Sequence, residues 1–223
     1  MDVKLMREAF VKYILGLVLV FVLLFFPAGT IRYWNGWLFI GLLFLPMFFL
    51  GVALFIKAPD LLQKRLRDKE VETEQKKVVG GAAILFLVGF ILAGLNYRYG
   101  WFVLPKAVCM GAAIVFLMAY LLYAEELREN TYLSRTIEVQ ENQKVIDTGL
   151  YGIVRHPMYF ATVLLFLSMP LILASLQAFI IFLAYPFIIA KRIKHEESFL
   201  EKELVGYSEY KSKVKYRMLP YIW

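Results

Sequence analysis

The sequence predicts an all-α integral membrane protein with four transmembrane helices, a membrane helical hairpin and a C-terminal cytoplasmic amphipathic helix. Three observations favour this fold class. Hydrophobic residues make up 61% of the chain and the mean hydropathy is +0.63, well above the values of ordinary soluble domains. The apolar residues form blocks, several of which reach the roughly 20 residues that cross a hydrocarbon core. Lys and Arg are concentrated in a few segments between these blocks, as in the cytoplasmic loops of membrane proteins.

Four apolar blocks are long enough to be membrane spans. They cover residues 10–27, 37–56, 80–96 and 102–123. Residues 1–123 are therefore predicted to form a transmembrane scaffold. Polar residues that can take part in chemistry gather in residues 124–223, which contain a linker, the hairpin and a C-terminal cap. We expect this second part to carry the functional site.

The stretch from Tyr159 to Ala190 is uncharged throughout, but it differs from the four spans. It is interrupted by Met169-Pro170 and by Ser175 and Gln177. At about 1.5 Å per residue, each half is slightly short of a full crossing. The pattern therefore predicts a tight helical hairpin that dips deep into the bilayer and brings both polar ends to one side.

The 25 Lys and Arg residues indicate the orientation. They accumulate in residues 57–79, in the segment between the fourth span and the hairpin, and in the tail after Ala190. Basic residues favour the cytoplasmic side, so we expect a multi-pass protein with both termini cytoplasmic. The net charge of +7 fits a protein that faces anionic lipid better than one that binds nucleic acid, because the basic residues are split among separate loops.

The sequence offers no cysteine-based site. Cys109 is the single cysteine and lies in an apolar span, so neither a disulfide framework nor a metal site is expected. A thiol in such surroundings stays protonated and inert. The sequence also lacks G-x-G-x-x-G, which excludes the soluble dinucleotide-binding architecture.

The most informative segment precedes the hairpin and reads Gly149-Leu-Tyr-Gly-Ile-Val-Arg-His-Pro-Met-Tyr159. Arg155 provides a planar set of donors, and His156 can donate or accept a hydrogen bond near neutral pH. Pro157 suits the first turn of a helix, whose unpaired N–H groups attract an anion such as a cofactor carboxylate. The alternative is interfacial anchoring, in which Arg155 reaches to the water and Tyr159 lies among the headgroups.

A second polar cluster follows the hairpin. Arg192 and Glu196 lie one turn apart on the same face if the helix continues, with Glu197 adjacent. The alternative is a surface ion pair, worth about half a kcal/mol. Because the hairpin returns to the side where it began, its two polar ends are expected to converge on one pocket.

The tail from Leu204 to Pro220 repeats aromatic and basic residues at near-helical spacing. This pattern predicts an amphipathic helix that lies on the membrane interface as a cap. We expect the cap to serve packing, with ligand contact as the alternative.

Four motifs follow one another in the C-terminal half of the chain. They are Gly149-x-Tyr151-x-x-x-Arg155-His156-Pro157-x-Tyr159, Arg192-x-x-x-Glu196-Glu197, Gly206-Tyr207-x-x-Tyr210 and Leu219-Pro220. In order and spacing they resemble the isoprenylcysteine carboxyl methyltransferase and phospholipid methyltransferase superfamily of integral membrane methyltransferases. The first two spans show only the general hydrophobic character of that superfamily.

The resemblance implies an S-adenosylmethionine-dependent methyltransferase whose catalytic region is residues 124–223. It implies that Glu196 contacts the cofactor and that Arg192 holds the reacting group of the substrate. The residues expected to be catalytic are Arg192, Glu196 and Glu197. The substrate is expected to be a lipid or prenylated molecule from the bilayer, and the oligomeric state is left open. The implied cofactor pocket is lined by Gln143, Lys144, Val145, Ile146, Tyr151, His156, Pro157, Met158 and Tyr159.

The methyl acceptor can be a carboxylate or an amine. The first expectation is carboxyl (O-) methylation of an isoprenylcysteine-like acceptor, since a carboxylate is ionised at neutral pH and Arg192 can orient it through two hydrogen bonds. The alternative is N-methylation of a phospholipid such as phosphatidylethanolamine. An amine must lose a proton before attack, and Glu196 or Glu197 would then be the candidate base.

Two further alternatives remain. The chain could be a noncatalytic membrane protein that binds or transports a ligand, although the interiors of the first four spans hold almost no ionisable residues for an ion path. The superfamily also resembles the membrane sterol reductases in architecture, and these use a nicotinamide cofactor. Cofactor binding therefore separates the alternatives.

Overall fold

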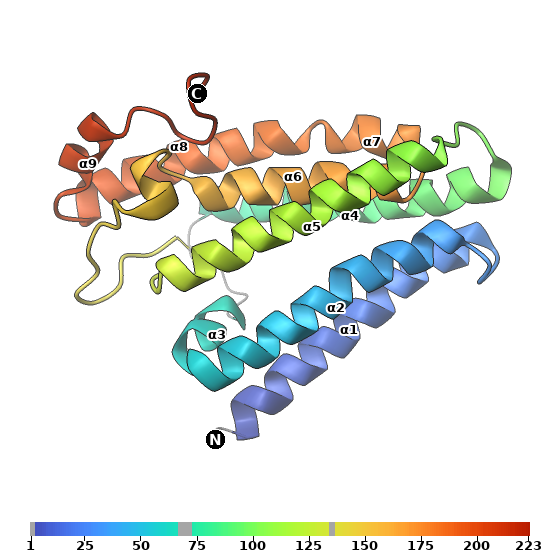
Figure 1. Ribbon diagram of the computed structural model, residues 1–223, viewed down its shortest axis with the longest axis horizontal. Coiled ribbons are helices and arrows are strands. Elements are labelled where there is room, and N and C mark those ends of the chain that lie inside the picture. The colour runs from blue at the N-terminus through green and yellow to red at the C-terminus, as the bar shows by residue number, and fades with distance from the viewer. Residues whose placement is uncertain (1–2, 67–72, 134–136) are drawn as a thin grey trace.

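The computed structural model describes residues 3–66, 73–133 and 137–223, and no β-strand occurs within these ranges (Figure 1). An isolated antiparallel bridge joins Val103 to Ser175. The expected all-α fold class is therefore confirmed. The elements in chain order are α1 (Val3–Ala28), α2 (Trp34–Lys57), α3 (Pro59–Leu66), α4 (Thr73–Tyr99), α5 (Lys106–Glu129), the short 3-10 helix η1 (Gly149–Gly152), α6 (Pro157–Ile172), α7 (Leu176–Phe182), α8 (Tyr185–Glu203) and α9 (Tyr207–Lys213).

Several helices have the length and composition of membrane spans. α6 is shorter but also apolar. Large apolar side chains face outward along α1 and α2, as in a protein whose solvent is lipid. These features confirm an integral membrane protein, while the number of helices that cross the bilayer stays a prediction. The long apolar stretches are Val3–Ala28, Trp34–Lys57, Val79–Tyr99, Lys106–Glu129 and Leu176–Glu203.

The fourth span begins later than the expected residue 102. Pro105 is the N-cap of α5, and the residues before it form a loop. The side chain of Asn96 holds this loop, because its Oδ1 accepts the N–H of Phe102 at 3.0 Å and its Nδ2 donates to the Phe102 carbonyl at 3.3 Å. Residues 101–104 are as apolar as the helix, so composition placed the start of the helix too early.

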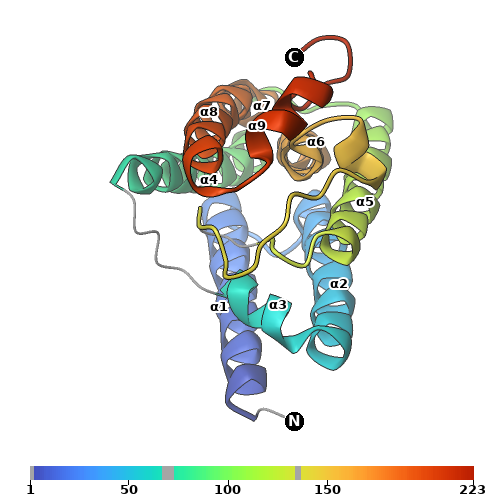
Figure 2. The same ribbon diagram turned by 90° about the vertical axis from the view of Figure 1, so that its left-hand side faces the viewer.

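The helices form two layers. α1 and α2 are an antiparallel pair that lies beneath the layer of α4, α5, α6, α7 and α8 (Figure 1). α1 packs along α4, and α5 packs along α6. The view from the end shows α3 below the linker that joins α5 to α6 (Figure 2).

Aromatic side chains fill the space between the helices. Phe39 of α2 contacts Phe90 of α4 and Phe116 of α5, with ring centroids 5.6 and 6.1 Å apart, and all three rings are buried. α4 approaches α7 closely at Gly89, where a Cβ would come within 2.2 Å of the Phe182 ring. The shared core joins both halves of the chain into one packed bundle.

The expected hairpin is present as α6 followed by α7 and α8. Pro170 lies inside α6, which continues to Ile172, and the turn falls at residues 173–175. Ala174 adopts a positive φ of 58°, and the Ser175 side chain caps α7 by accepting the Ala178 N–H at 3.3 Å. A second break between α7 and α8 was not expected, and Leu183 lies in it. The interruption at Met169-Pro170 thus marks the approach to the turn. Pro170 has no N–H to donate to the carbonyl one turn earlier, which weakens the last turn of α6.

The turn of the hairpin reaches the far end of the bundle, where the loops after α1 and α4 lie. The Tyr33 hydroxyl donates to the Leu173 carbonyl at 2.7 Å, and Nδ2 of Asn35 donates to the Ile172 carbonyl at 2.7 Å. The last carbonyls of a helix have no partner within it, so these side chains satisfy them. The hairpin is therefore fixed at its turn as well as at its open end.

The tail is helical over a shorter range than expected. α9 covers only Tyr207–Lys213, and residues 214–217 run back beside the start of α6. The start of α1, the C-terminus and α3 lie toward the same end of the bundle (Figure 1). That this end is cytoplasmic stays a prediction. Residues 67–72 of the expected basic loop, and Arg135 of the linker, lie outside the described residues.

Candidate active site

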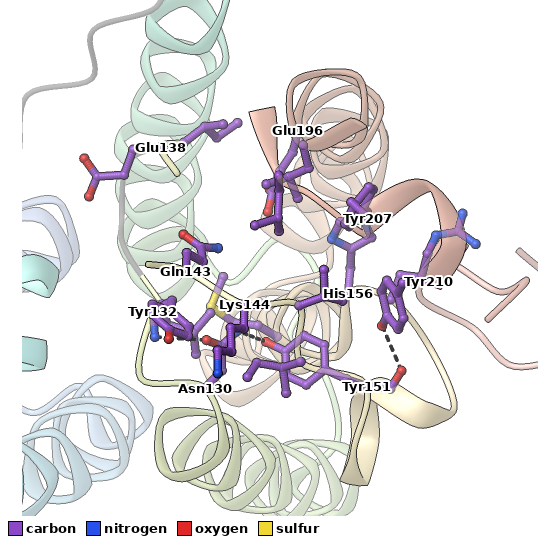
Figure 3. Close-up of a pocket in the computed structure, with 18 of the residues that line it drawn as sticks. Asn130, Tyr132, Glu138, Gln143, Lys144, Tyr151, His156, Glu196, Tyr207 and Tyr210 are labelled. Atoms are coloured by element: carbon purple, nitrogen blue, oxygen red, sulfur yellow. Dashed lines mark hydrogen bonds between the residues drawn. The ribbon is translucent and has the colours of Figure 1, made fainter. Parts of the chain in front are cut away.

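The two polar ends of the hairpin meet at one cavity (Figure 3). α6 begins there, with His156 as N-cap and Pro157 in its first turn. α8 returns to the same place and contributes Arg192 and Glu196. The linker and the tail close the remaining sides. The lining residues are Asn130, Tyr132, Leu133, Ile137, Glu138, Gln143, Lys144, Val145, Ile146, Tyr151, Arg155, His156, Met158, Tyr159, Arg192, Glu196, Leu200, Leu204, Tyr207 and Tyr210.

Tyr159 joins two charged residues of α8 on the cavity wall. Nε of Arg192 donates to the Tyr159 hydroxyl at 2.9 Å, and this hydroxyl donates to Oε2 of Glu196 at 2.5 Å. Hydrogen bonds with an ionised partner are stronger than neutral ones. The three side chains therefore form a fixed polar row from α8 to α6 instead of a mobile surface ion pair.

Glu197 lies behind this row in a buried ion cluster. Its Oε1 accepts from Nε of Arg155 at 2.7 Å and lies 3.3 Å from Nε2 of His156, and its Oε2 accepts from Nε of Arg217 at 2.9 Å. The side chains of Arg155 and Glu197 are 4% and 3% exposed. A buried charge of this kind requires partners, and Glu197 therefore joins the start of α6, α8 and the tail.

The tail forms part of the cavity wall. Tyr207 and Tyr210 of α9 line the cavity, and the Tyr210 hydroxyl donates to the Tyr151 carbonyl at 2.8 Å (Figure 3). Packing was the expected role of this segment, with ligand contact as the alternative, and the same residues both pack on η1 and line the cavity. The Gly206-Tyr207-x-x-Tyr210 spacing was the signal in the sequence, since residues three apart share a helix face.

The tail also holds the backbone of the Arg-His motif in place. The N–H groups of residues 155 and 156 donate to the carbonyls of residues 216 and 217 at 2.9 and 2.7 Å. Nη1 of Arg155 donates to the Val214 carbonyl at 2.5 Å. Backbone hydrogen bonds on both sides of His156 fix the point at which α6 starts.

Glu129, at the end of α5, shapes the turn into η1. Its Oε1 accepts the Thr148 hydroxyl at 3.0 Å, and its Oε2 accepts the Leu150 N–H at 3.4 Å. Gly149 lies in this turn with a φ of +51°, and a Cβ there would come within 2.2 Å of the Glu129 carboxylate. The turn therefore requires glycine for both its backbone conformation and its close approach.

α3 reaches the site from the first half of the chain. Nζ of Lys64 donates to Oε1 of Gln140 in the linker at 2.5 Å. The guanidinium of Arg65 hydrogen-bonds the Tyr123 hydroxyl and lies 3.8 Å from Sδ of Met158, which lines the cavity. Residues 1–123 therefore contribute contacts to the site, which the sequence patterns did not indicate.

Three buried phenols stay protonated on the cavity wall. Burial, with a smaller contribution from nearby carboxylates, raises the pKa of Tyr151, Tyr207 and Tyr210 well above its ordinary value of 10.0. They therefore act as neutral hydrogen-bonding groups. Among the described residues, no group of three or more His, Cys, Asp or Glu side chains is arranged to hold a metal ion.

Most of the residues expected at the site line the cavity, but Pro157 and Glu197 do not. Pro157 is buried in the first turn of α6, and Glu197 faces the ion cluster. Sequence analysis missed Asn130, Tyr132 and Leu200, which reach the cavity only because the linker and α8 fold against each other. The expected residues that line the cavity are Gln143, Lys144, Val145, Ile146, Tyr151, His156, Met158, Tyr159, Arg192 and Glu196.

Part of the chain that builds this cavity is similar to a known protein family. Residues 106–205 match the phospholipid methyltransferase family model. The match runs from α5 to the end of α8, and the tail wall from Tyr207 onward lies outside it. No curated protein matches the chain. Residues 106–205 are therefore similar to the phospholipid methyltransferases, which are part of the superfamily of integral membrane methyltransferases that also includes the isoprenylcysteine carboxyl methyltransferases.

Proposed function

We propose that the chain is an S-adenosylmethionine-dependent methyltransferase that acts on a lipid-like substrate at the cytoplasmic face of the membrane. One observation carries the proposal: the polar ends of the hairpin, which contain the first two of the four motifs, enclose one cavity together with the linker and the tail. An apolar exterior beside this cavity allows a lipid to approach from the bilayer, while the cofactor arrives from water.

The cavity suits a cofactor that carries both charges and an aromatic base. His156 is the N-cap of α6 but makes no side-chain capping bond, so the start of the helix can receive the cofactor carboxylate. Glu196 offers an anion for the amino group, and Tyr132, Tyr207 and residues 143–146 offer surface for the base and sugar. S-adenosylmethionine supplies a methyl group already activated on sulfur, so the protein chiefly aligns the acceptor and excludes water.

If the reaction is carboxyl methylation, the role proposed for Arg192 is to orient the carboxylate of the acceptor. The Tyr159 hydroxyl accepts from its Nε, which holds the guanidinium plane at the cavity wall. A carboxylate is ionised at neutral pH and needs no base. The role proposed for Arg192 is therefore to present one carboxylate oxygen of an isoprenylcysteine-like acceptor to the methyl group.

N-methylation of a phospholipid amine is the second candidate, and the description of the matched family, phospholipid methyltransferase, favours it. This reaction needs a group that takes the amine proton. Glu197 does not suit this role, because both of its oxygens are bound by cationic partners behind the cavity wall. Glu196 faces the cavity, although its Oε2 already accepts the Tyr159 hydroxyl.

Binding of the cofactor to purified protein in detergent tests the proposal. We expect His156→Ala to weaken S-adenosylmethionine binding about tenfold, which corresponds to about 1.4 kcal/mol, in isothermal titration. Arg192→Ala should leave that affinity within a factor of about three and lower turnover about 10²-fold, as loss of an orienting donor does. His195→Ala is the control for both variants. His195 lies on α8, as Arg192 does, but it does not line the cavity.

Incubation with labelled cofactor and a membrane lipid extract identifies the methylated product. Retention of NADPH in place of S-adenosylmethionine would contradict the proposal and favour a reductase. Binding of neither cofactor would favour a noncatalytic membrane protein.

A further inference from the structure

α3 contacts the linker that forms one wall of the cavity, and it lies below this linker in the view from the end (Figure 2). Nζ of Lys64 donates to Oε1 of Gln140 at 2.5 Å. A hydrogen bond with a charged donor is stronger than a neutral one. Both side chains are partly buried, so water competes for this bond less than it does at an open surface. The linker is therefore bound to a helix from the first half of the chain.

Gln140 connects this contact to two residues of the cavity wall. Its Nε2 donates to the Tyr132 carbonyl at 2.7 Å, and its backbone N–H donates to Oε1 of Gln143 at 2.9 Å. Because the amide oxygen of Gln140 accepts from Lys64, its amide nitrogen is directed to the Tyr132 carbonyl. Tyr132 and Gln143 line the cavity, whereas Lys64 and Gln140 do not. Lys64 therefore acts on the cavity wall through Gln140.

The residues that follow Gln140 form a tight turn. The Gln143 N–H donates to the Gln140 carbonyl at 3.0 Å, and Asn142 adopts a positive φ of 57°. The Tyr132 hydroxyl donates to the Asn142 carbonyl at 3.3 Å. These bonds join Tyr132 and residues 140–143 into one unit. A contact from α3 to Gln140 therefore positions the whole unit.

α3 is itself fixed on the helical bundle. It begins at Pro59 directly after α2, and the side chains of Leu61 and Leu62 are buried. The guanidinium of Arg65 hydrogen-bonds the Tyr123 hydroxyl of α5. Lys64 is thus attached to a packed helix, and the linker turn takes its position from that helix.

We propose that Lys64 is a positioning residue for the cofactor, because it holds the linker turn through Gln140 and so keeps Tyr132 and Gln143 in the cavity wall. The inference rests on the proposed methyltransferase function and adds to it a residue outside the family match of residues 106–205. A binding wall that is formed only part of the time lowers the affinity by that fraction. Lys64 therefore raises cofactor affinity by keeping the wall formed before the cofactor arrives.

A positioning role and a purely structural role predict different kinetics. Loss of positioning raises the KM for the cofactor and leaves turnover at saturating cofactor unchanged, because the bound cofactor restores the wall. The polar row of Arg192, Tyr159 and Glu196 belongs to α6 and α8 and stays in place. A general loss of stability instead lowers turnover at every cofactor concentration and shifts the unfolding curve.

The test compares Lys64→Met with Lys57→Met in detergent. Lys57 is the matched control, because it carries the same charge in the last turn of α2 and its side chain is exposed. We expect Lys64→Met to weaken S-adenosylmethionine binding about tenfold in isothermal titration, as a wall formed about a tenth of the time would. Lys57→Met should stay within about twofold of the unmodified protein, and Lys64→Arg, which keeps a charged donor, within about threefold. Turnover of a membrane lipid extract at saturating labelled cofactor should be the same in all four proteins.

Hydrogen exchange of the linker provides a readout without cofactor. In Lys64→Met, the amides of residues 137–147 should exchange about tenfold faster, because local opening of the linker costs less free energy. Gln140→Leu should show the same change in exchange. The double variant should bind the cofactor no more weakly than Gln140→Leu alone, since both residues act through one contact. Gln140 lies in a half-buried linker, so its variant decides the question even where Lys64→Met does not fold.

Cofactor affinity of Lys64→Met within about twofold of the unmodified protein overturns the inference. Additive losses in the double variant, or a fall in turnover at saturating cofactor, overturn it as well. These results leave the methyltransferase function standing if the unmodified protein binds S-adenosylmethionine and methylates a lipid. Failure of the unmodified protein to bind S-adenosylmethionine overturns both.

Discussion

Glu197→Ala should destabilise the protein more than any neighbouring substitution on α8. The carboxylate accepts hydrogen bonds from Arg155 at 2.7 Å and Arg217 at 2.9 Å and lies beside His156. These partners belong to the start of α6 and to the tail, whereas Glu197 belongs to α8. Removal of the Glu197 carboxylate therefore breaks the contacts that join α8 to the start of α6 and to the tail.

The burial of Arg155 and Arg217 determines how much the free energy of unfolding falls. The Arg155 side chain is 4% exposed, so loss of Glu197 leaves an uncompensated buried charge, which costs about 3–5 kcal/mol. The Arg217 side chain is 29% exposed, and water can replace its partner, so its contribution is at most about 1 kcal/mol. We therefore expect the free energy of unfolding to fall by about 3–5 kcal/mol in total, a sum set almost entirely by Arg155.

Glu201→Ala is the matched control. Glu201 lies one turn further along α8 and pairs with Lys211 at 2.7 Å, with side chains 36% and 32% exposed. An exposed pair of this kind contributes about 0–1 kcal/mol. Unfolding of both variants in mixed micelles with increasing dodecyl sulfate, followed by circular dichroism, measures the difference. Unfolding free energies that differ by less than about 1 kcal/mol would refute the view that buried Glu197 joins the three segments.

Two further predictions concern the tail and the turn before η1. Tyr210→Phe should lower the free energy of unfolding by about 1–3 kcal/mol, because a buried backbone carbonyl loses its donor. Tyr207→Phe should change it by less than about 0.5 kcal/mol, since the buried Tyr207 hydroxyl makes no hydrogen bond to any described residue; equal losses in the two unfolding curves would contradict this. Gly149→Ala should weaken cofactor binding by displacing the Glu129 carboxylate. Gly41→Ala is the control, because an added methyl group there meets open space. Equal cofactor affinities of the two variants in isothermal titration would show that the turn tolerates a side chain.

Much of the architecture follows from local patterns in the sequence. Long apolar blocks give the helices of the bundle, and Pro157 marks the start of α6. The uncharged stretch with Ser175 at its centre gives the hairpin. These features depend on residues close together in the chain, so periodicity and composition can reveal them. Where residues outside a helix are as apolar as the helix, as in residues 101–104, the same reasoning places the boundary wrongly.

The chemistry of the site depends on contacts between distant segments. Glu196 and Glu197 are adjacent, and the sequence gives no reason to separate them. Successive residues of a helix point about 100° apart, so one faces the cavity and the other faces Arg155. The partners of each carboxylate come from α6 and the tail, which no local pattern could bring to the same place.

The sequence by itself determined that the chain is helical, is membrane-embedded and has polar clusters at the two ends of one hairpin, because hydrophobicity and helix-start signals are local. Only the tertiary structure decided that the tail completes the cavity, that α3 contacts it from the first half, and that Glu126 is buried with no hydrogen bond to any described residue. The environment of a side chain is set by the packing of elements far apart in the chain, and that packing places Glu196 on the cavity wall and Glu197 in a buried ion cluster.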